Sequence, residues 1–198
     1  MRTRTFGPGD FRVMPWKNGT GSTTELLIEP PGATLAGGFR WRLSMAAVAA
    51  SGPFSSFPGY DRTLLLLEGR GLELDHGAHG RALLPGPLVP ARFPGEWATH
   101  GRLLDGPCLD FNVMSRREAA LHDLTIIFPG PPAPLPEAEV VLVFCAAGTA
   151  SVGADLLRAG ELLRVDGPGA SGLLARATDG EAALVVVALG AAPGCGDK

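Results

Sequence analysis

Glycine and proline interrupt this chain so often that short strands are favoured over long helices. The 198 residues include 28 Gly and 18 Pro, which favour turns and disfavour helix interiors. Between the interruptions lie short aliphatic segments, the clearest being residues 63–68, 140–145 and 183–189. Aliphatic runs bounded by turn residues are typical of buried strands. The sequence therefore predicts an all-β fold.

The segment Phe39–Met45 predicts a strand with two different faces. Its residues alternate between apolar and polar types. Because successive side chains of a strand point to opposite sides, Arg42 and Ser44 share one face, and Trp41 and Leu43 share the other. If the apolar face packs against a second layer, the polar pair points into the interior of a barrel.

The order of turns and strands in the first half recurs in the second half. Three glycines occupy matching places in the two halves, and they pair as Gly71 with Gly148, Gly86 with Gly160 and Gly106 with Gly180. The members of each pair are about 75 residues apart, which indicates an internal duplication.

A repeated series of strand, glycine turn and strand is typical of an antiparallel barrel or jelly roll. We therefore expect a bicupin, in which two double-stranded β-helix (jelly-roll) barrels pack together; a pair of immunoglobulin-like sandwiches is the alternative. The expected parts are an N-terminal region with the first barrel (1–128), a Pro-rich linker (129–137) and the second barrel (138–198). One short helix is expected over Ser115–Leu121, because Ser115 can cap its first turn.

Charge and hydropathy argue against several partners. The net charge of −3, without a polybasic segment, disfavours nucleic acid. The longest apolar run, 182–192, is too short to cross a membrane, and residues 1–10 lack the apolar core of a signal peptide. The three cysteines, Cys108, Cys145 and Cys195, are far apart and odd in number. We interpret them as reduced thiols of a cytoplasmic protein.

Several motifs follow one another between residues 10 and 117. They are Met14-Pro15-Trp16-Lys17-Asn18-Gly19, Phe39-x-Trp41-Arg42-x-Ser44, Gly52-Pro53-Phe54-Ser55, Gly59-x-Asp61-Arg62 and Asp110-Phe111-Asn112-Val113-Met114-Ser115. In this order they resemble the HutD/Ves family. The resemblance implies a bicupin fold and a regulatory or accessory role in histidine utilisation. It also implies a small carboxylated ligand, such as urocanate or a formyl- or formimino-glutamate.

We expect neither a metal nor another cofactor. Most cupins hold a metal through a His-x-His pair and a Glu, but the corresponding stretch, Phe54–Arg62, contains no histidine. His76 and His79 lie in a Gly-rich hairpin tip where they could share an ion. That segment lacks the further ligands that a closed site needs.

Polar residues of the first half form a candidate anion site. Lys17 is one of only two lysines in the chain, and Arg42 and Arg62 suit a carboxylate because the guanidinium group can bond both oxygens. The residues expected to orient the ligand or line the pocket are Asn18, Glu25, Ser44, Phe54, Asp110 and Asn112. A structural interpretation competes with this one: ion pairs Arg42–Asp110 and Arg62–Asp61, with Asn18 as a turn residue.

Three functions remain open from the sequence. We favour a metal-free protein that binds a small carboxylate, with a homodimer as a possible assembly. The alternative is a metal-independent isomerase or hydrolase that uses Lys17, Glu25 or Asp110 as acid or base. The third is a structural protein with a vestigial pocket. The second half is apolar and poor in convergent polar groups, so we expect it to be structural.

Overall fold

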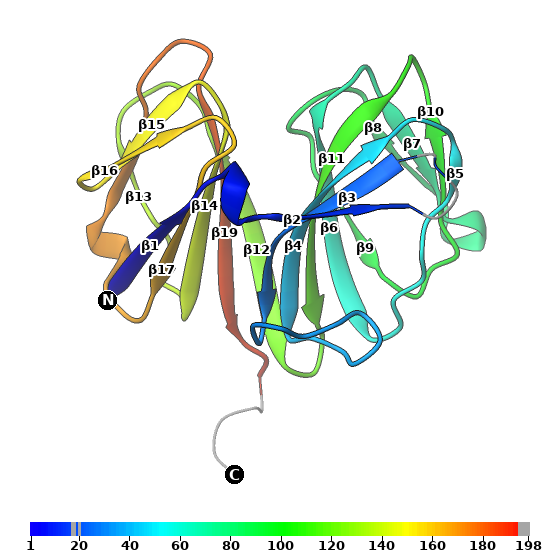
Figure 1. Ribbon diagram of the computed structural model, residues 1–198, viewed down its shortest axis with the longest axis horizontal. Coiled ribbons are helices and arrows are strands. Elements are labelled where there is room, and N and C mark those ends of the chain that lie inside the picture. Colours follow the sequence, from blue (N-terminus) through cyan, green and yellow to red (C-terminus); the bar gives the residue numbers. More distant parts are fainter. Residues whose placement is uncertain (17–18, 20, 194–198) are drawn as a thin grey trace. The chain divides into compact units, whose positions relative to one another are not determined.

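The computed structural model describes residues 1–16, 19 and 21–193. Their regular structure consists of strands and three single turns of 3-10 helix. No helix in these ranges has the length and hydropathy of a membrane span. The chain forms two compact units. Phe11–Ala120 is the central unit, and Met1–Asp10 with Leu121–Lys198 is the flanking unit (Figure 1).

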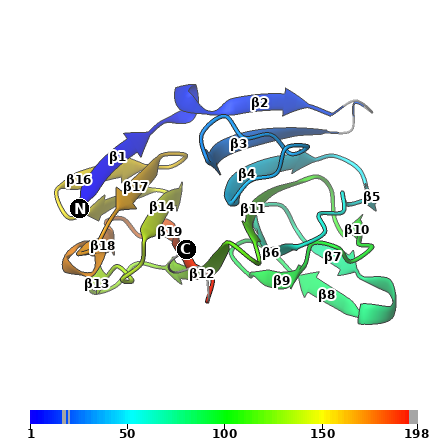
Figure 2. The same cartoon turned by 90° about the horizontal axis from the view of Figure 1, so that it is seen from below.

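The central unit consists of two antiparallel sheets (Figure 2). The larger has the strand order β2-β3-β4-β11-β6-β9 and the smaller β5-β10-β7-β8. Strands of the larger sheet are β2 (Arg12–Pro15), β3 (Gly21–Glu29), β4 (Trp41–Val48), β6 (Tyr60–Glu68), β9 (Ala91–Pro94) and β11 (Cys108–Arg116). Strands of the smaller sheet are β5 (Gly52–Pro53), β7 (Leu72–Asp75), β8 (Arg81–Leu84) and β10 (His100–Leu103). The strands expected from residues 39–45 and 63–68 correspond to β4 and β6.

An apolar core joins the two sheets of the central unit. Leu64 and Leu66 of β6 belong to one hydrophobic cluster with Leu72 and Leu74 of β7, and all four side chains are fully buried. Burying one leucine side chain contributes about 1.5–3 kcal/mol relative to leaving it exposed. This core holds the inward face of the larger sheet against the smaller one.

The flanking unit also has two antiparallel sheets, with the orders β1-β17-β14-β19-β12 and β13-β18-β15-β16. Its strands are β1 (Arg2–Phe6), β12 (Ala120–Ile127), β13 (Ala133–Pro134), β14 (Val140–Ala147), β15 (Thr149–Val152), β16 (Asp155–Arg158), β17 (Leu162–Asp166), β18 (Leu174–Ala177) and β19 (Ala183–Ala191). Both sheets repeat a strand order of the central unit. The order β19-β14-β17 matches β11-β6-β9 of its larger sheet, and β18-β15-β16 matches β10-β7-β8 of its smaller sheet. The shared strand order agrees with the duplication predicted from the glycine spacing.

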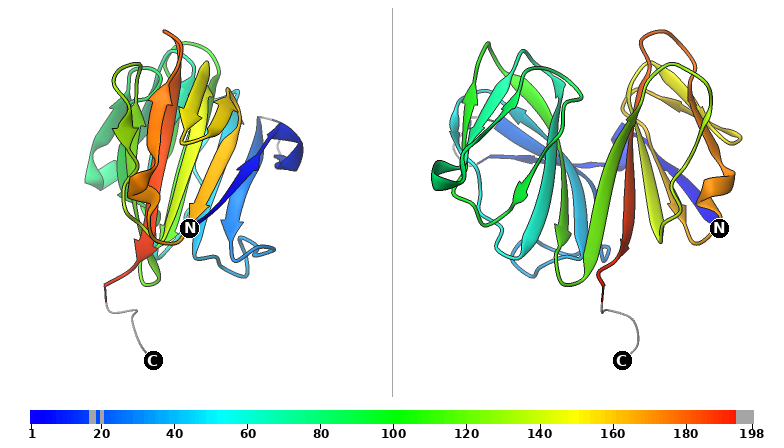
Figure 3. Two further views of the ribbon diagram at one scale, coloured as in Figure 1. Left: turned by 90° about the vertical axis from the view of Figure 1, so that its left-hand side faces the viewer. Right: turned by 180° about the vertical axis from the view of Figure 1, so that it is seen from behind.

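The division of the chain differs from the expected parts 1–128, 129–137 and 138–198. Residues 1–10 belong to the flanking unit, because β1 pairs with β17 along its whole length (Figure 3, left). The Pro-rich stretch does not join the units, since it lies inside the flanking unit, where β13 pairs with β18. Sequence composition marks proline-rich segments but does not show which distant strand they pair with.

The expected helix over Ser115–Leu121 is wrong. Ser115 pairs with both Trp41 of β4 and Asp61 of β6, so pairing continues to the end of β11. The N–H of Ala119 then donates to the carbonyl of Arg116 at 2.9 Å in a turn, after which β12 begins. Sheet hydrogen bonds on both sides satisfy more backbone groups than one capped helical turn can.

Gly69 provides a test of the turn that precedes β7. Its φ is +117°, and an added Cβ would lie 2.6 Å from the Cβ of Cys108. We predict that Gly69→Ala lowers the free energy of unfolding by about 2–4 kcal/mol, because a positive φ and a buried clash both disfavour alanine. Urea denaturation measures this change. Gly106 has a φ of +78° with open space around it, so Gly106→Ala should cost only about 1 kcal/mol. Equal losses in the two variants would contradict the role of the contact.

Candidate functional site

One face of the larger sheet carries a group of polar side chains. The pairing of β4, β11 and β6 arranges this face in three rows: Arg42–Met114–Arg62, Ser44–Asn112–Leu64 and Ala46–Asp110–Leu66. Glu25 of β3 pairs with Ser44 and extends the second row. Leu64 and Leu66 belong to the core between the sheets, so this face points into the interior of the central unit. We call its polar members the polar cluster: Glu25, Arg42, Ser44, Arg62, Asp110 and Asn112.

The polar cluster is almost completely buried. Arg42 and Arg62 are each 4% exposed, and Asp110 is 2% exposed. In the described part of the chain, every buried polar or charged side chain lies between positions 42 and 115, within the central unit. Burying such groups is unfavourable unless partners replace the lost water. The cluster is therefore the feature of the interior that most needs an explanation.

Arg42 has partners for only part of its guanidinium group. Its Nε donates to Glu25 Oε2 at 2.7 Å, and its Nη1 donates to Ser44 Oγ at 3.2 Å. The remaining nitrogen, Nη2, is buried without a hydrogen-bonding partner among the described residues. Arg42 thus keeps one guanidinium nitrogen, Nη2, available as a donor after its ion pair with Glu25 is made.

Arg62 lies among aromatic rings and lacks a carboxylate partner. Its Cζ lies 5.0 Å from the ring centroid of Phe93, 5.5 Å from Phe54 and 5.6 Å from Phe57. Its Nη1 donates to the carbonyl of Ser55 at 3.3 Å, whereas its buried Nε has no described partner. Burial lowers the pKa of Arg62 to about 10, so the side chain remains charged at neutral pH. Cation–π contacts stabilise this charge but do not neutralise it.

Asp110 is the buried acid of the cluster. Burial raises its pKa to about 7, although the charge of Arg62 and a hydrogen bond with the Ala46 backbone act in the opposite direction. Its Oδ1 has no hydrogen-bonding partner among the described residues. Asp110 therefore changes charge close to neutral pH, inside a space that water does not reach freely.

Four atoms of the cluster are buried and unpaired in the described chain. They are Arg42 Nη2, Arg62 Nε, Asp110 Oδ1 and Asn112 Oδ1. Each such atom costs about 1–3 kcal/mol if nothing hydrogen-bonds to it, and native interiors contain few of them. Four on one face indicate a place where a small molecule or ordered water completes the hydrogen bonding.

Neither of the structural ion pairs considered from the sequence is formed. Arg42 pairs with Glu25 and not with Asp110. Asp61 forms an ion pair with Arg117 at 2.8 Å, and not with Arg62. Both alternatives are wrong, because the fold places Glu25 beside Arg42 and Arg117 beside Asp61.

Six of the nine predicted site residues form the polar cluster, and the others have different positions. Phe54 is half-buried beside Arg62 and forms one of its aromatic contacts. Lys17 and Asn18 lie outside the described residues. Phe93, which pairs with Arg62 across β6 and β9, was not predicted from the sequence. No local signal could have identified Phe93, because only the pairing of these strands brings the two side chains together.

His76 and His79 lie in different environments. His76 is buried, with Nδ1 2.8 Å from Thr99 Oγ1 and its ring 4.8 Å from that of Phe93. His79 is exposed and stacks on Trp97 at 4.4 Å. Burial lowers the pKa of His76, which favours the neutral ring.

The interior of the central unit does not fit a metal ion. No group of three His, Cys, Asp or Glu side chains suited to a metal was found among the described residues. The polar cluster also contains two guanidinium groups, whose positive charges would repel a cation. Its donors suit an anion better.

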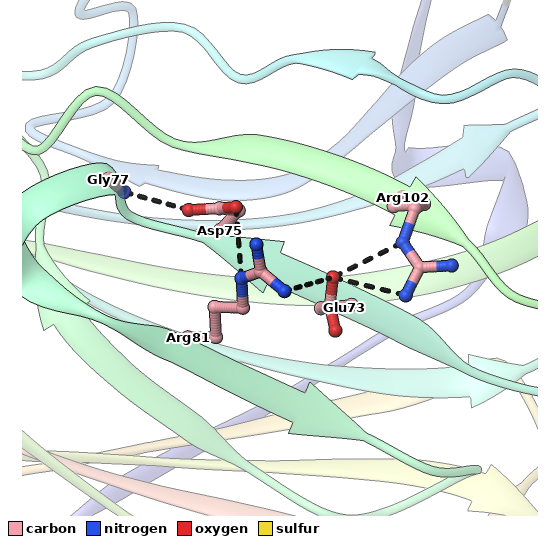
Figure 4. A network of polar contacts seen from close by, with 5 residues as sticks. All are labelled: Glu73, Asp75, Gly77, Arg81 and Arg102. Atoms are coloured by element: carbon pink, nitrogen blue, oxygen red, sulfur yellow. Dashed lines mark hydrogen bonds and ion pairs between the residues drawn. The ribbon is translucent and has the colours of Figure 1, made fainter.

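The polar groups on the outside of the smaller sheet form a contrasting network (Figure 4). Glu73 accepts from Arg102 at 3.2 Å, and Asp75 accepts from Arg81 at 3.1 Å. Both arginines are more than half exposed. Exposed ion pairs contribute only about 0–1 kcal/mol. This network is complete and exposed to solvent, whereas the polar cluster is incomplete and buried.

A surface hollow of about 310 Å³ lies at the ends of β3, β4 and β11. Its described lining is mostly small and apolar, and includes Gly21, Val48 and Cys108 but no charged residue. Burial raises the pKa of the Cys108 thiol to about 11, which keeps it unreactive. The hollow therefore offers less chemistry than the polar cluster.

The HutD family model matches residues 9–184. The chain belongs to the HutD family. The "uncharacterized 21.2 kDa protein in hutC 3'region" of Pseudomonas putida is 37% identical over 167 residues, which are 80% of this chain and 84% of that protein. Protein Ves of Escherichia fergusonii is 38% identical over 111 residues, 54% of this chain and 56% of Ves. The resemblance drawn from the motifs is confirmed.

Solved structures agree with this assignment. HutD from Pseudomonas fluorescens SBW25 has a TM-score of 0.80 at 32% identity, covering 96% of this chain and 99% of that one. An oxalate decarboxylase of Lactobacillus farciminis has a TM-score of 0.63 at 10% identity, covering 96% and 86%. At that identity the likeness concerns the fold alone. Together with the paired sheets of both units, it confirms the expected bicupin fold of this HutD-family protein.

Asp110 provides a pH test of the cluster. Its pKa is about 7 in the folded protein, above its value of about 4 in an unfolded chain. The folded state therefore binds the proton more tightly, and stability falls as pH rises from about 4 to 7. We predict a loss on the order of 4 kcal/mol over this range that is absent in Asp110→Asn. Urea denaturation of both proteins from pH 4.5 to 7.5 measures it. Parallel curves for the two proteins would contradict the raised pKa.

Proposed function

We propose that this protein binds a small carboxylated metabolite without a metal, between the two sheets of the central unit. In this proposal the protein is a regulatory or accessory component of histidine utilisation. The observation that carries the proposal is Arg62, a buried charge without a carboxylate partner in the described chain. Keeping a guanidinium buried and unpaired is costly. A ligand carboxylate would complete its hydrogen bonding.

The first row of the cluster supports the same ligand chemistry. Arg42 and Arg62 flank Met114 across three strands, and the charge of Arg42 contributes to lowering the pKa of Arg62. Two neighbouring guanidinium groups that repel each other are stabilised by an anion between them. The rings of Phe54 and Phe93 leave this end of the site largely apolar, which strengthens a charge-assisted hydrogen bond.

The relatives support a role close to histidine breakdown. The Pseudomonas putida protein is named for its place in the hutC 3' region, and the Pseudomonas fluorescens structure is named HutD. The metabolites that fit the proposal are urocanate, formiminoglutamate and formylglutamate. A cytoplasmic location is part of the proposal, and the free, buried thiols of Cys108 and Cys145 are compatible with it.

One observation favours an enzyme as the second candidate. Asp110 has a pKa of about 7, which is suited to proton transfer at neutral pH. A metal-independent isomerase or hydrolase could use Asp110 as acid or base. NMR of each metabolite incubated with the protein distinguishes the two functions, since only the enzyme consumes its ligand and loses that activity in Asp110→Asn.

Replacing Arg62 tests the binding site. We predict that Arg62→Met weakens binding of the tightest of the three metabolites by at least about tenfold, because a charge-assisted hydrogen bond is worth roughly 1.5–3 kcal/mol. Thermal-shift titration measures the effect, since a ligand of the folded state raises the melting temperature with concentration. The apolar Met keeps similar length and removes a buried charge, so the variant should fold.

Arg102→Met is the matched control, because Arg102 is exposed and lies on the outer face of the smaller sheet. It should bind like the wild type. Unchanged affinity in folded Arg62→Met would remove Arg62 from the site. If none of the three metabolites shifts the melting temperature of the wild type, the proposed function is wrong.

A further inference from the structure

We infer that the polar cluster has two chemically different ends and takes a ligand with a carboxylate at one end and an N–H group at the other. This inference rests on the proposed function and adds the residue that would distinguish one carboxylate ligand from another. It comes from the kinds of atoms that are left unpaired and from their order along the sheet. Asp110 is the residue that would recognise the N–H group.

Unpaired donors lie in the first row of the cluster. Arg42 Nη2 and Arg62 Nε are buried N–H groups without described partners, and their residues flank Met114. Neither can accept a hydrogen bond, because guanidinium nitrogens only donate. The ligand must therefore present acceptor atoms here, and a carboxylate supplies two of them with the negative charge that Arg62 lacks.

An unpaired acceptor lies in the third row. Asp110 is four residues before Met114 on β11, and its Oδ1 is buried without a described partner. Four residues along a strand span about 13 Å between Cα atoms, and one row lies between the two ends. When Asp110 is ionised, both of its oxygens accept hydrogen bonds. A negative group of the ligand placed beside Asp110 would be repelled, whereas an N–H group would be attracted.

The row between the two ends is partly apolar. It contains Ser44, Asn112 and Leu64, and Leu64 belongs to the core between the sheets. Leu66 lies beside Asp110 in the third row. The part of the ligand that joins its carboxylate to its N–H group would therefore run along leucine side chains. A short apolar or planar linker fits these surroundings better than a chain of polar groups.

The charges of the cluster favour the same ligand class. Glu25 is already paired with Arg42, so it does not compete for the ligand. Asp110 forms no ion pair with Arg62, although the two charges influence each other. A purely anionic ligand would satisfy the arginines and leave Asp110 with its unpaired oxygen. A ligand that also carries an N–H group would satisfy both ends.

Two probe molecules of nearly the same shape test the inference. Urocanate and cinnamate share an acrylate group, but urocanate carries an imidazole N–H where cinnamate has a phenyl ring. We expect isothermal titration calorimetry at pH 8, where the imidazole is neutral, to show at least about tenfold tighter binding of urocanate. Formylglutamate and glutarate form a second pair, since glutarate keeps the two carboxylates and lacks the N–H group.

Asp110→Leu tests whether Asp110 is responsible for this preference. We expect the variant to lose at least about tenfold in affinity for urocanate and formylglutamate, and to bind cinnamate and glutarate within about threefold of the wild type. Asp110→Ala is the second variant if the leucine protein does not fold, because an asparagine would still accept from the ligand's N–H group. Asp105→Leu is the control, because Asp105 is an exposed carboxylate outside the cluster, and it should bind all four probes like the wild type.

Equal affinity of the two probes in each pair would overturn the inference. So would equal losses of affinity for both probes of a pair in Asp110→Leu. Either result would mean that water, and not the ligand, bonds to the unpaired oxygen of Asp110. In that case the proposed function survives if binding still depends on Arg62. If none of the four carboxylates binds the wild-type protein, the proposed function and this inference both fail. The proposed function and the inference are both supported if binding of all four probes depends on Arg62 and only binding of the two probes with an N–H group depends on Asp110.

Discussion

The pairing of β11 between β4 and β6 is the constraint on which the interior of the central unit depends. Residues on paired strands alternate between two faces, so one register decides all inward side chains at once. The observed register brings Arg42, Arg62, Asp110 and Asn112 to the same face. A shift of β11 by one residue would turn Asp110 and Asn112 away from the smaller sheet and separate them from Arg42 and Arg62. The site is therefore a consequence of backbone hydrogen bonding before any side-chain interaction.

Burial gives the polar cluster its chemistry and also its cost. The same exclusion of water that raises the pKa of Asp110 lowers that of Arg62, because low-dielectric surroundings disfavour both charged forms. The apolar core of leucines from both sheets provides the stability that such a site requires. The flanking unit has the same strand order around an apolar core. Among the described residues, the buried charged side chains all belong to the central unit, although the flanking unit repeats its strand order.

Much of the fold could be predicted from the sequence. Aliphatic runs between glycines and prolines indicated the strands now seen as β6, β14 and β19, and the alternation after Phe39 indicated the two faces of β4. These signals are local, since they depend on the strand propensity of neighbouring residues and on the alternation of side chains along one strand. Local signals failed at Ser115, where a helix cap and a strand end look alike in sequence. They also failed for β1, whose partner β17 is distant in the chain.

The sequence by itself determined which chemical groups are present and which of them share the face of a strand. The shared face of Arg42 and Ser44 followed from alternation alone. Only the tertiary structure decided the partner of each charge: Glu25 for Arg42, Arg117 for Asp61, and aromatic rings for Arg62. The reason is that ion pairing depends on distances of a few ångströms between strands far apart in sequence. Those distances are set by strand register and by packing between sheets, which no local pattern specifies.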